Sequence, residues 1–124
     1  MEPKLKIWVA FGQKTKFGDG RARLLELIDQ LGSINKAVSR FGMSYRTAWG
    51  YIQELESAAG FRFLERRPGG GAQGGARLTK DGQRFLRCYW DFRKGLESVV
   101  TRQFARAFKD GHRSTFRRDR PRRS

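Results

Sequence analysis

Two short amphipathic segments, joined by the residues GMS (42–44), constrain the fold of this chain more than any other feature. Ser33 is placed to cap the first segment and Ser44 the second, because serine hydroxyls accept hydrogen bonds from the first free amides of a helix. Glycine fits the turn because a helix commonly ends on a residue with positive φ. Ile52 lies on an apolar face that would hold the second helix against the first. The pattern predicts a helix-turn-helix over about residues 33–59.

The exposed start of the second helix carries hydroxyl groups, a guanidinium and a glycine. These groups suit phosphates and base edges in the major groove of DNA. The spacing alone is not specific, since ordinary helical hairpins resemble it. The candidate DNA contacts on this helix are Ser44, Tyr45, Arg46, Thr47 and Gly50. We expect Arg46 to read a base, guanine, and Ser33 and Lys36 of the preceding helix to hold backbone phosphates.

The glycine-rich stretch PGGGAQGGAR (68–77) contains a literal G-x-G-x-x-G. A dinucleotide-binding fingerprint requires a helix that opens directly on the last glycine, but a strand-like ARL follows here. We therefore interpret the stretch as the tip of a hairpin between strands 61–66 and 76–78, which is a DNA-binding wing. The alternative is a surface hairpin without contacts. The candidate wing contacts to phosphate or the minor groove are Arg66, Arg67 and Arg77.

Three elements frame this motif. Residues 4–11 alternate apolar and polar side chains, which predicts an N-terminal strand, with a short second strand at 15–17. Asp19 is placed to cap a helix that Gly32 ends. The fold class is therefore mainly α with a small β part: a winged helix-turn-helix with an N-terminal strand and a long C-terminal helix.

The last helix is expected from Thr79, its cap, to about residue 109. Its apolar positions follow heptad spacing, a narrow seam that pairs helices of two copies. The alternative is a helix wrapped on its own domain. The candidate dimerisation residues are Phe85, Tyr89, Phe92, Leu96 and Val99. We expect a DNA-binding domain over 1–78 with its wing at about 61–78, a dimerisation helix over 79–110 and a basic, disordered tail over 111–124.

The net charge of +15 favours an anionic partner, and nucleic acid above others. The longest apolar run, 7–11, is far shorter than the roughly 20 residues of a membrane span. The lone Cys88 excludes an internal disulfide and fits a reducing compartment. We therefore expect a cytoplasmic, nucleoid-associated protein without a membrane partner.

Catalytic chemistry has little support in the sequence. The one histidine, His112, lies in the expected tail, so no Ser-His-Asp or Cys-His set can form in the core. No cluster has metal-ligand spacing, and we expect no catalytic residue, no metal and no cofactor. Four helical carboxylates among basic neighbours are interpreted as surface ion pairs: Glu26, Asp29, Glu54 and Glu56.

The segments GSINKAVSRFGMSYRTAW (32–49) and GGGAQGGARLTKDGQRFL (69–86) resemble the N-terminal winged-helix domain of the ModE family. These are molybdate-responsive transcriptional regulators whose DNA-binding fold is close to the LysR type. The resemblance covers about residues 5–100 and implies that Ser44 to Thr47 open the recognition helix. It also implies that the glycine loop is the wing and that the helix after it forms the homodimer.

Full-length members of that family continue into molybdate-binding domains, whereas this chain ends in an arginine-rich segment. Nothing in it resembles an oxyanion pocket, so the resemblance implies a stand-alone DNA-binding domain without a molybdate site of its own. We expect a homodimeric regulator that binds double-stranded DNA sequence-specifically, with molybdenum- or tungsten-related genes as targets by family analogy. The rival hypothesis is an architectural, sequence-neutral nucleoid protein.

Overall fold

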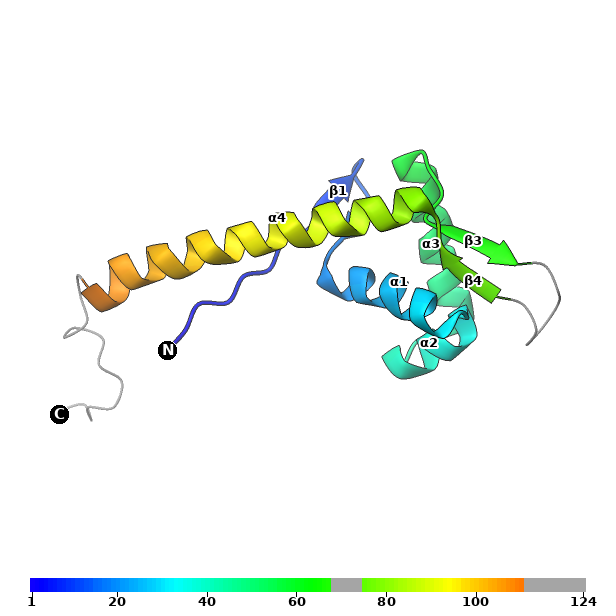
Figure 1. The fold of residues 1–124 in the computed structure, drawn as a ribbon, viewed down its shortest axis with the longest axis horizontal. Coiled ribbons are helices and arrows are strands. Elements are labelled where there is room, and N and C mark those ends of the chain that lie inside the picture. Colours follow the sequence, from blue (N-terminus) through cyan, green and yellow to red (C-terminus); the bar gives the residue numbers. More distant parts are fainter. Residues whose placement is uncertain (68–74, 111–124) are drawn as a thin grey trace. The chain divides into compact units, whose positions relative to one another are not determined.

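The computed structural model describes residues 1–67 and 75–110, so the expected wing tip and basic tail lie outside the described residues. It divides into two units, Ile7–Cys88 and Met1–Lys6 with the residues from Tyr89 onward, which we describe separately. The elements are β1 Val9–Phe11, β2 Thr15–Phe17, α1 Asp19–Leu31, α2 Ile34–Phe41, α3 Tyr45–Ala59, β3 Leu64–Arg67, β4 Gly75–Leu78, α4 Lys80–Phe104 and a π-helical turn Ala105–Asp110 (Figure 1). The mainly α fold with small antiparallel sheets is confirmed.

The helix ends follow the predicted capping chemistry. Ser33 Oγ accepts from the Lys36 amide at 3.2 Å, and Ser44 Oγ accepts from the Thr47 amide at 3.0 Å. Gly42 closes α2 with a φ of 63°, a conformation that glycine adopts without steric cost.

The start of α1 departs from the sequence prediction. Gly18 is its N-cap, and no side chain caps this end of the helix. Asp19 lies in the first turn instead, where its negative charge interacts favourably with the positive end of the helix dipole.

The N-terminal strand is shorter than predicted. β1 contains only Val9–Phe11, because its antiparallel partner β2 offers three residues, paired from Val9 opposite Phe17 to Phe11 opposite Thr15. Residues 4–8 have the alternating pattern but are not paired with another strand. The prediction of a strand over 4–11 was therefore wrong in extent.

An aromatic cluster joins the hairpin β1–β2, the start of β3 and the start of α4. Phe17 and Phe63 are fully buried, and the Phe85 ring meets both nearly edge-on, at centroid distances of 4.9 and 5.3 Å. Burying a phenylalanine contributes about 1.5–3 kcal/mol. Helices α1, α2 and α3 complete the core of this unit with Ala22, Leu24, Leu25, Ile28, Ile34, Ala37, Val38, Ala48, Ile52 and Leu55.

The first turn of α4 is fitted tightly against the end of the 60–63 segment. Thr79 Oγ1 accepts from the Gly82 amide at 2.9 Å, which confirms its predicted capping role, and donates to the Arg62 carbonyl at 2.6 Å. A Cβ on Gly82 would stand 2.6 Å from the Phe63 carbonyl oxygen. Only glycine lets the helix start this close to the backbone it packs on.

In the second unit, the Arg93 guanidinium donates to the Leu5 carbonyl at 3.1 Å and pairs with Glu97 at 3.1 Å. Phe104 and Phe108 stack with ring centroids 5.0 Å apart. Across the described residues, no helix is long and apolar enough to span a bilayer.

Candidate nucleic-acid interface

Helices α2 and α3 form the predicted helix-turn-helix. The Gly42 and Met43 amides both donate to the Val38 carbonyl, which closes α2 and turns the chain within three residues. Ser44 then opens α3. Its hydroxyl accepts from the Thr47 amide and donates to Thr47 Oγ1 at 2.9 Å, so the Ser44 side chain is engaged in holding the start of α3.

Helix α3 has one buried and one exposed face. Ala48, Ile52 and Leu55 are fully buried, whereas Arg46 and Gly50, four residues apart on the opposite side, are exposed. Gly50 has no heavy atom within 4 Å of the position a Cβ would take. The outward face therefore combines a guanidinium with a stretch of helix bare enough for another backbone to approach.

Tyr51 fixes the opposite side of α3 to the N-terminal hairpin. Its hydroxyl donates to the Lys16 carbonyl at 3.2 Å, and the Arg21 guanidinium lies 3.8 Å from the centre of its ring. Burial raises the pKa of Tyr51 from 10.0 to about 12, although the nearby Arg21 charge opposes that rise. These contacts hold α3 on the side away from Arg46.

The hairpin β3–β4 follows the helix-turn-helix and projects from the group of α1, α2 and α3, as a wing does (Figure 1). On β3, Leu64 is buried and Glu65, Arg66 and Arg67 are exposed, whereas on β4 the buried Ala76 and Leu78 flank the exposed Arg77. Arg77 stands opposite Glu65 and pairs with it at 3.6 Å, both side chains being more than half exposed. An exposed pair of this kind stabilises little and leaves Arg77 available to a stronger anion.

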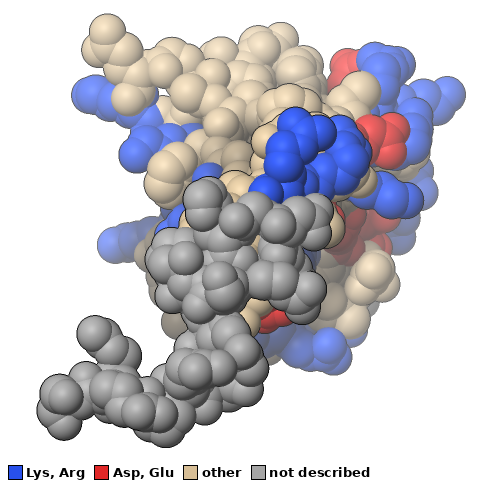
Figure 2. Space-filling view, turned by 90° about the vertical axis from the view of Figure 1, so that its left-hand side faces the viewer, with Lys and Arg blue, Asp and Glu red and all other residues tan. Residues whose placement is uncertain are grey.

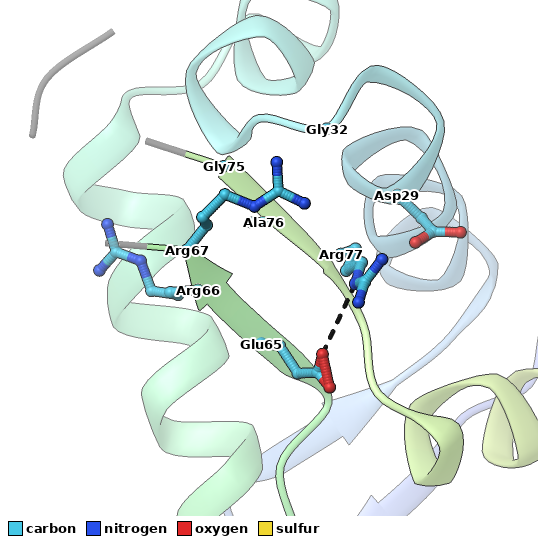
Figure 3. Close-up of a pocket in the computed structure, with 8 residues that line it drawn as sticks. All are labelled: Asp29, Gly32, Glu65, Arg66, Arg67, Gly75, Ala76 and Arg77. Atoms are coloured by element: carbon cyan, nitrogen blue, oxygen red, sulfur yellow. Dashed lines mark ion pairs between the residues drawn. The ribbon is translucent and has the colours of Figure 1, made fainter. Parts of the chain in front are cut away.

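Arg66 takes a different direction from Arg67. Its guanidinium donates to the Tyr45 hydroxyl at 2.7 Å and lies 4.4 Å from the centre of the Trp49 ring. In Figure 3, Arg66 points toward α3, whereas Arg67 extends over Ala76 toward the turn at Gly32. The wing is thus connected to α3 by a side chain that the sequence predicted to contact DNA.

Two carboxylates expected on the surface attach the wing to the helices instead. Glu56 Oε2 accepts from the amides of Phe63 and Leu64 at 2.7 and 3.0 Å, and Asp29 Oδ1 accepts from the Leu78 amide at 2.9 Å. Surface ion pairing was therefore the wrong interpretation for these two. The amides at the start of β3 and the end of β4 need acceptors, and helical carboxylates supply them.

A groove of about 290 Å³ lies along the junction of the end of α1 and the wing, where the Gly32 carbonyl accepts from the Ala76 amide at 3.1 Å (Figure 3). Its lining residues are Asp29, Gly32, Glu65, Arg66, Arg67, Gly75, Ala76 and Arg77. On the face drawn in Figure 2, Lys and Arg occur in several places and Asp and Glu in fewer. Ser33 and the exposed Lys36 lie at the start of α2.

The residues of the predicted dimerisation seam have different surroundings. Phe85 packs in the aromatic cluster, and Tyr89 is only 2% exposed. Phe92 and Val99 are 52% and 42% exposed, with Leu96 intermediate. The apolar surface that α4 offers to a partner is therefore confined to the part of the helix after Tyr89.

Among the described residues, no group of three His, Cys, Asp or Glu side chains could hold a metal ion. His112 lies outside those residues, and Cys88 is exposed on α4.

A helix-turn-helix followed by a two-stranded hairpin defines the winged helix-turn-helix class. The chain belongs to the family of bacterial regulatory helix-turn-helix proteins of the LysR type, which it matches over residues 21–83. This is a family of regulators and not of enzymes.

The relatives include transcriptional regulators named ModE and a molybdenum-pterin-binding protein, in agreement with the resemblance of the motifs. The chain is 39% identical to the transcriptional regulator ModE of Haemophilus influenzae over 69 residues, 56% of this chain and 27% of that protein. It is 34% identical to the DNA-binding transcriptional dual regulator ModE of Escherichia coli over 89 residues, 72% and 34% of the two chains. It is 31% identical to the molybdenum-pterin-binding protein MopB of Rhodobacter capsulatus over 86 residues, which are 69% of this chain and 32% of that protein. The similarity thus spans about a third of these relatives or less.

Proposed function

We propose that this chain binds double-stranded DNA sequence-specifically and regulates transcription by placing α3 in the major groove. The observation that carries the proposal is the two-sided α3 helix: its inner face is fully buried, and its outer face presents Arg46 and Gly50 to the solvent. Family membership supports the regulatory role, and the names of the relatives support a link to molybdenum-related genes.

The remaining proposed contacts come from α3 itself, from the start of α2 and from the wing. Arg46 reads a base, since a guanidinium binds the two acceptors of guanine at once. Thr47 and Tyr45 lie beside it at the start of α3, where Ser44 supports them by capping the helix. Lys36 and the cap Ser33 on α2 hold phosphates, and so do the wing arginines Arg67 and Arg77.

We further propose that the active form is a homodimer on a pseudo-palindromic site. Phe92, Leu96 and Val99 on α4 are apolar and at least partly exposed, and their 4-3 spacing suits pairing with a second copy. Phe85 and Tyr89 support that seam from within their own chain. In this proposal residues 1–78 bind DNA, 79–110 dimerise, and the basic segment 111–124 adds affinity without sequence information in a nucleoid-associated, cytoplasmic protein.

Selection from a pool of random duplexes tests the proposal. A sequence-specific dimer enriches an inverted repeat, because two copies of α3 read two half-sites about one helical turn apart. Equal retention of all sequences would overturn the proposal in favour of an architectural protein. A Phe92→Lys/Val99→Lys double variant is expected to be monomeric in sedimentation and to protect only half-sites, with the exposed Lys94→Glu as a control that remains dimeric.

A further inference from the structure

We propose that Arg66 is a positioning residue, which fixes the direction of the wing relative to the recognition helix and so determines how both reach DNA together. The inference rests on the proposed function. It concerns three side chains of one unit, Arg66 on β3 and Tyr45 and Trp49 on α3, which we call the wing tie.

The geometry of the wing tie follows from two periodicities. Side chains two apart on a strand share a face, so Arg66 lies on the face of the buried Leu64 and not on that of Arg67. Tyr45 and Trp49 are four apart on α3 and therefore lie one above the other. The long Arg66 side chain reaches α3, where it donates to the Tyr45 hydroxyl and lies over the Trp49 ring.

The position of Arg66 along the hairpin gives the tie its leverage. At the base of the wing, Glu56 holds the amides of Phe63 and Leu64, and Asp29 holds the Leu78 amide. Further out, on the side of α1, the Gly32 carbonyl accepts from the Ala76 amide at 3.1 Å. Arg66 stands opposite Ala76, one pair from the last described pair of the ladder. Arg66 therefore holds the α3 side of a ladder pair whose other member is bonded to Gly32, and the two contacts together set the angle at which the hairpin leaves the body.

The chemistry of the tie distinguishes it from a phosphate contact. The Arg66 guanidinium already has a hydrogen-bond acceptor and an aromatic face, both supplied by α3. Arg67, the next residue, is exposed and points to the other side, across Ala76 toward Gly32 (Figure 3). Neighbouring arginines therefore have different roles: Arg67 adds affinity, and Arg66 aligns two DNA-binding elements.

A first experiment examines the tie without DNA. In a background with Trp8→Phe and Trp90→Phe, Trp49 is the sole tryptophan and reports on its own surroundings. We expect Arg66→Ala and Tyr45→Phe each to change Trp49 emission, with the double variant no further changed, whereas Arg67→Ala leaves emission unaltered. If Arg66→Ala leaves Trp49 emission unchanged, the wing tie does not exist, whether or not the protein binds DNA.

A second experiment measures DNA affinity against salt, on duplexes from the selection and on random duplexes. Arg66→Ala should weaken binding to the selected duplex about five- to seventyfold, the range that one hydrogen bond plus one exposed cation–π contact carries. Tyr45→Phe removes the hydrogen bond alone and should weaken binding less, and the double variant should bind no more weakly than Arg66→Ala. The slope of log affinity against log salt should stay unchanged in Arg66→Ala and become shallower by about 0.9 in Arg67→Ala.

Each outcome separates the possibilities. A shallower salt slope in Arg66→Ala, or additive losses with Tyr45→Phe, would overturn the positioning role, because Arg66 would then contact phosphate directly. Random duplexes show the slopes even where the selection yields no motif, so failure of the proposed function remains distinguishable from failure of the wing tie. A circular-dichroism melt of each variant confirms that the loss is one of alignment and not of folding.

Discussion

Replacement of Gly82 by alanine should destabilise the protein, against the ordinary preference of helices for alanine. The added Cβ would lie 2.6 Å from the Phe63 carbonyl oxygen, which must retreat by about 0.8 Å to reach ordinary contact at 3.4 Å. That oxygen accepts the Thr79 amide at 3.0 Å and belongs to a fully buried residue. Overpacking costs about 1–3 kcal/mol and the strained hydrogen bond about 1 kcal/mol, against a helix-propensity gain of about 0.5–1 kcal/mol.

The expected net loss of unfolding free energy is therefore about 1–3 kcal/mol, measurable by urea unfolding followed at 222 nm. Gly95→Ala provides the matched control on the same helix, because nothing lies within 4 Å of its Cβ position. This control should gain about 0.5–1 kcal/mol. A Gly82→Ala protein as stable as the parent would refute the close packing of α4 on the segment before β3.

Three further changes test other parts of the structure. Glu56→Ala should cost about 1.5–3 kcal/mol for each of the two amide bonds lost, whereas the exposed Glu54→Ala changes urea stability by less than about 0.5 kcal/mol; equal effects would contradict the anchoring role. Gly50→Ala should raise stability by about 0.5–1 kcal/mol yet weaken binding to a selected duplex, and unchanged binding would contradict close approach of DNA to α3. Since the raised pKa of Tyr51 favours its neutral form, the stability from this group is complete below pH 10 and lost as pH rises toward 12. Absorbance at 295 nm follows all three tyrosines, so the informative signal is the transition that Tyr51→Phe removes. That transition should lie near pH 12, and removal of one near pH 10 would contradict burial of the ring.

Local chemistry explains which features could be predicted from the sequence. Ser33 and Ser44 were identifiable as caps because a serine hydroxyl satisfies the first free amides of a helix through contacts within three residues. The glycine at 42 marks the end of α2 for an equally local reason, its positive φ. The wing was predictable because the segment ARL, after the glycines, has the pattern of a strand and not of a helix.

Features that depend on distant partners were not predictable in the same way. β1 is short because β2 is short, and Glu56 is an acceptor because the start of β3 comes to lie beside it. Charge alone makes Glu56 resemble a surface residue. The direction of Arg66 was available in principle, since strand alternation places it on the face of Leu64, but its two partners on α3 become evident only in the folded chain.

The effect of Arg46→Ala on two DNAs is the most direct measure of whether α3 reads sequence. At one fixed salt concentration, this variant should lose about 1–3 kcal/mol of binding to the selected duplex and much less on a random duplex. Arg87→Ala, which removes the same charge from an exposed position on α4, should leave the ratio of the two affinities unchanged. An equal loss on both duplexes from Arg46→Ala would contradict sequence reading by α3.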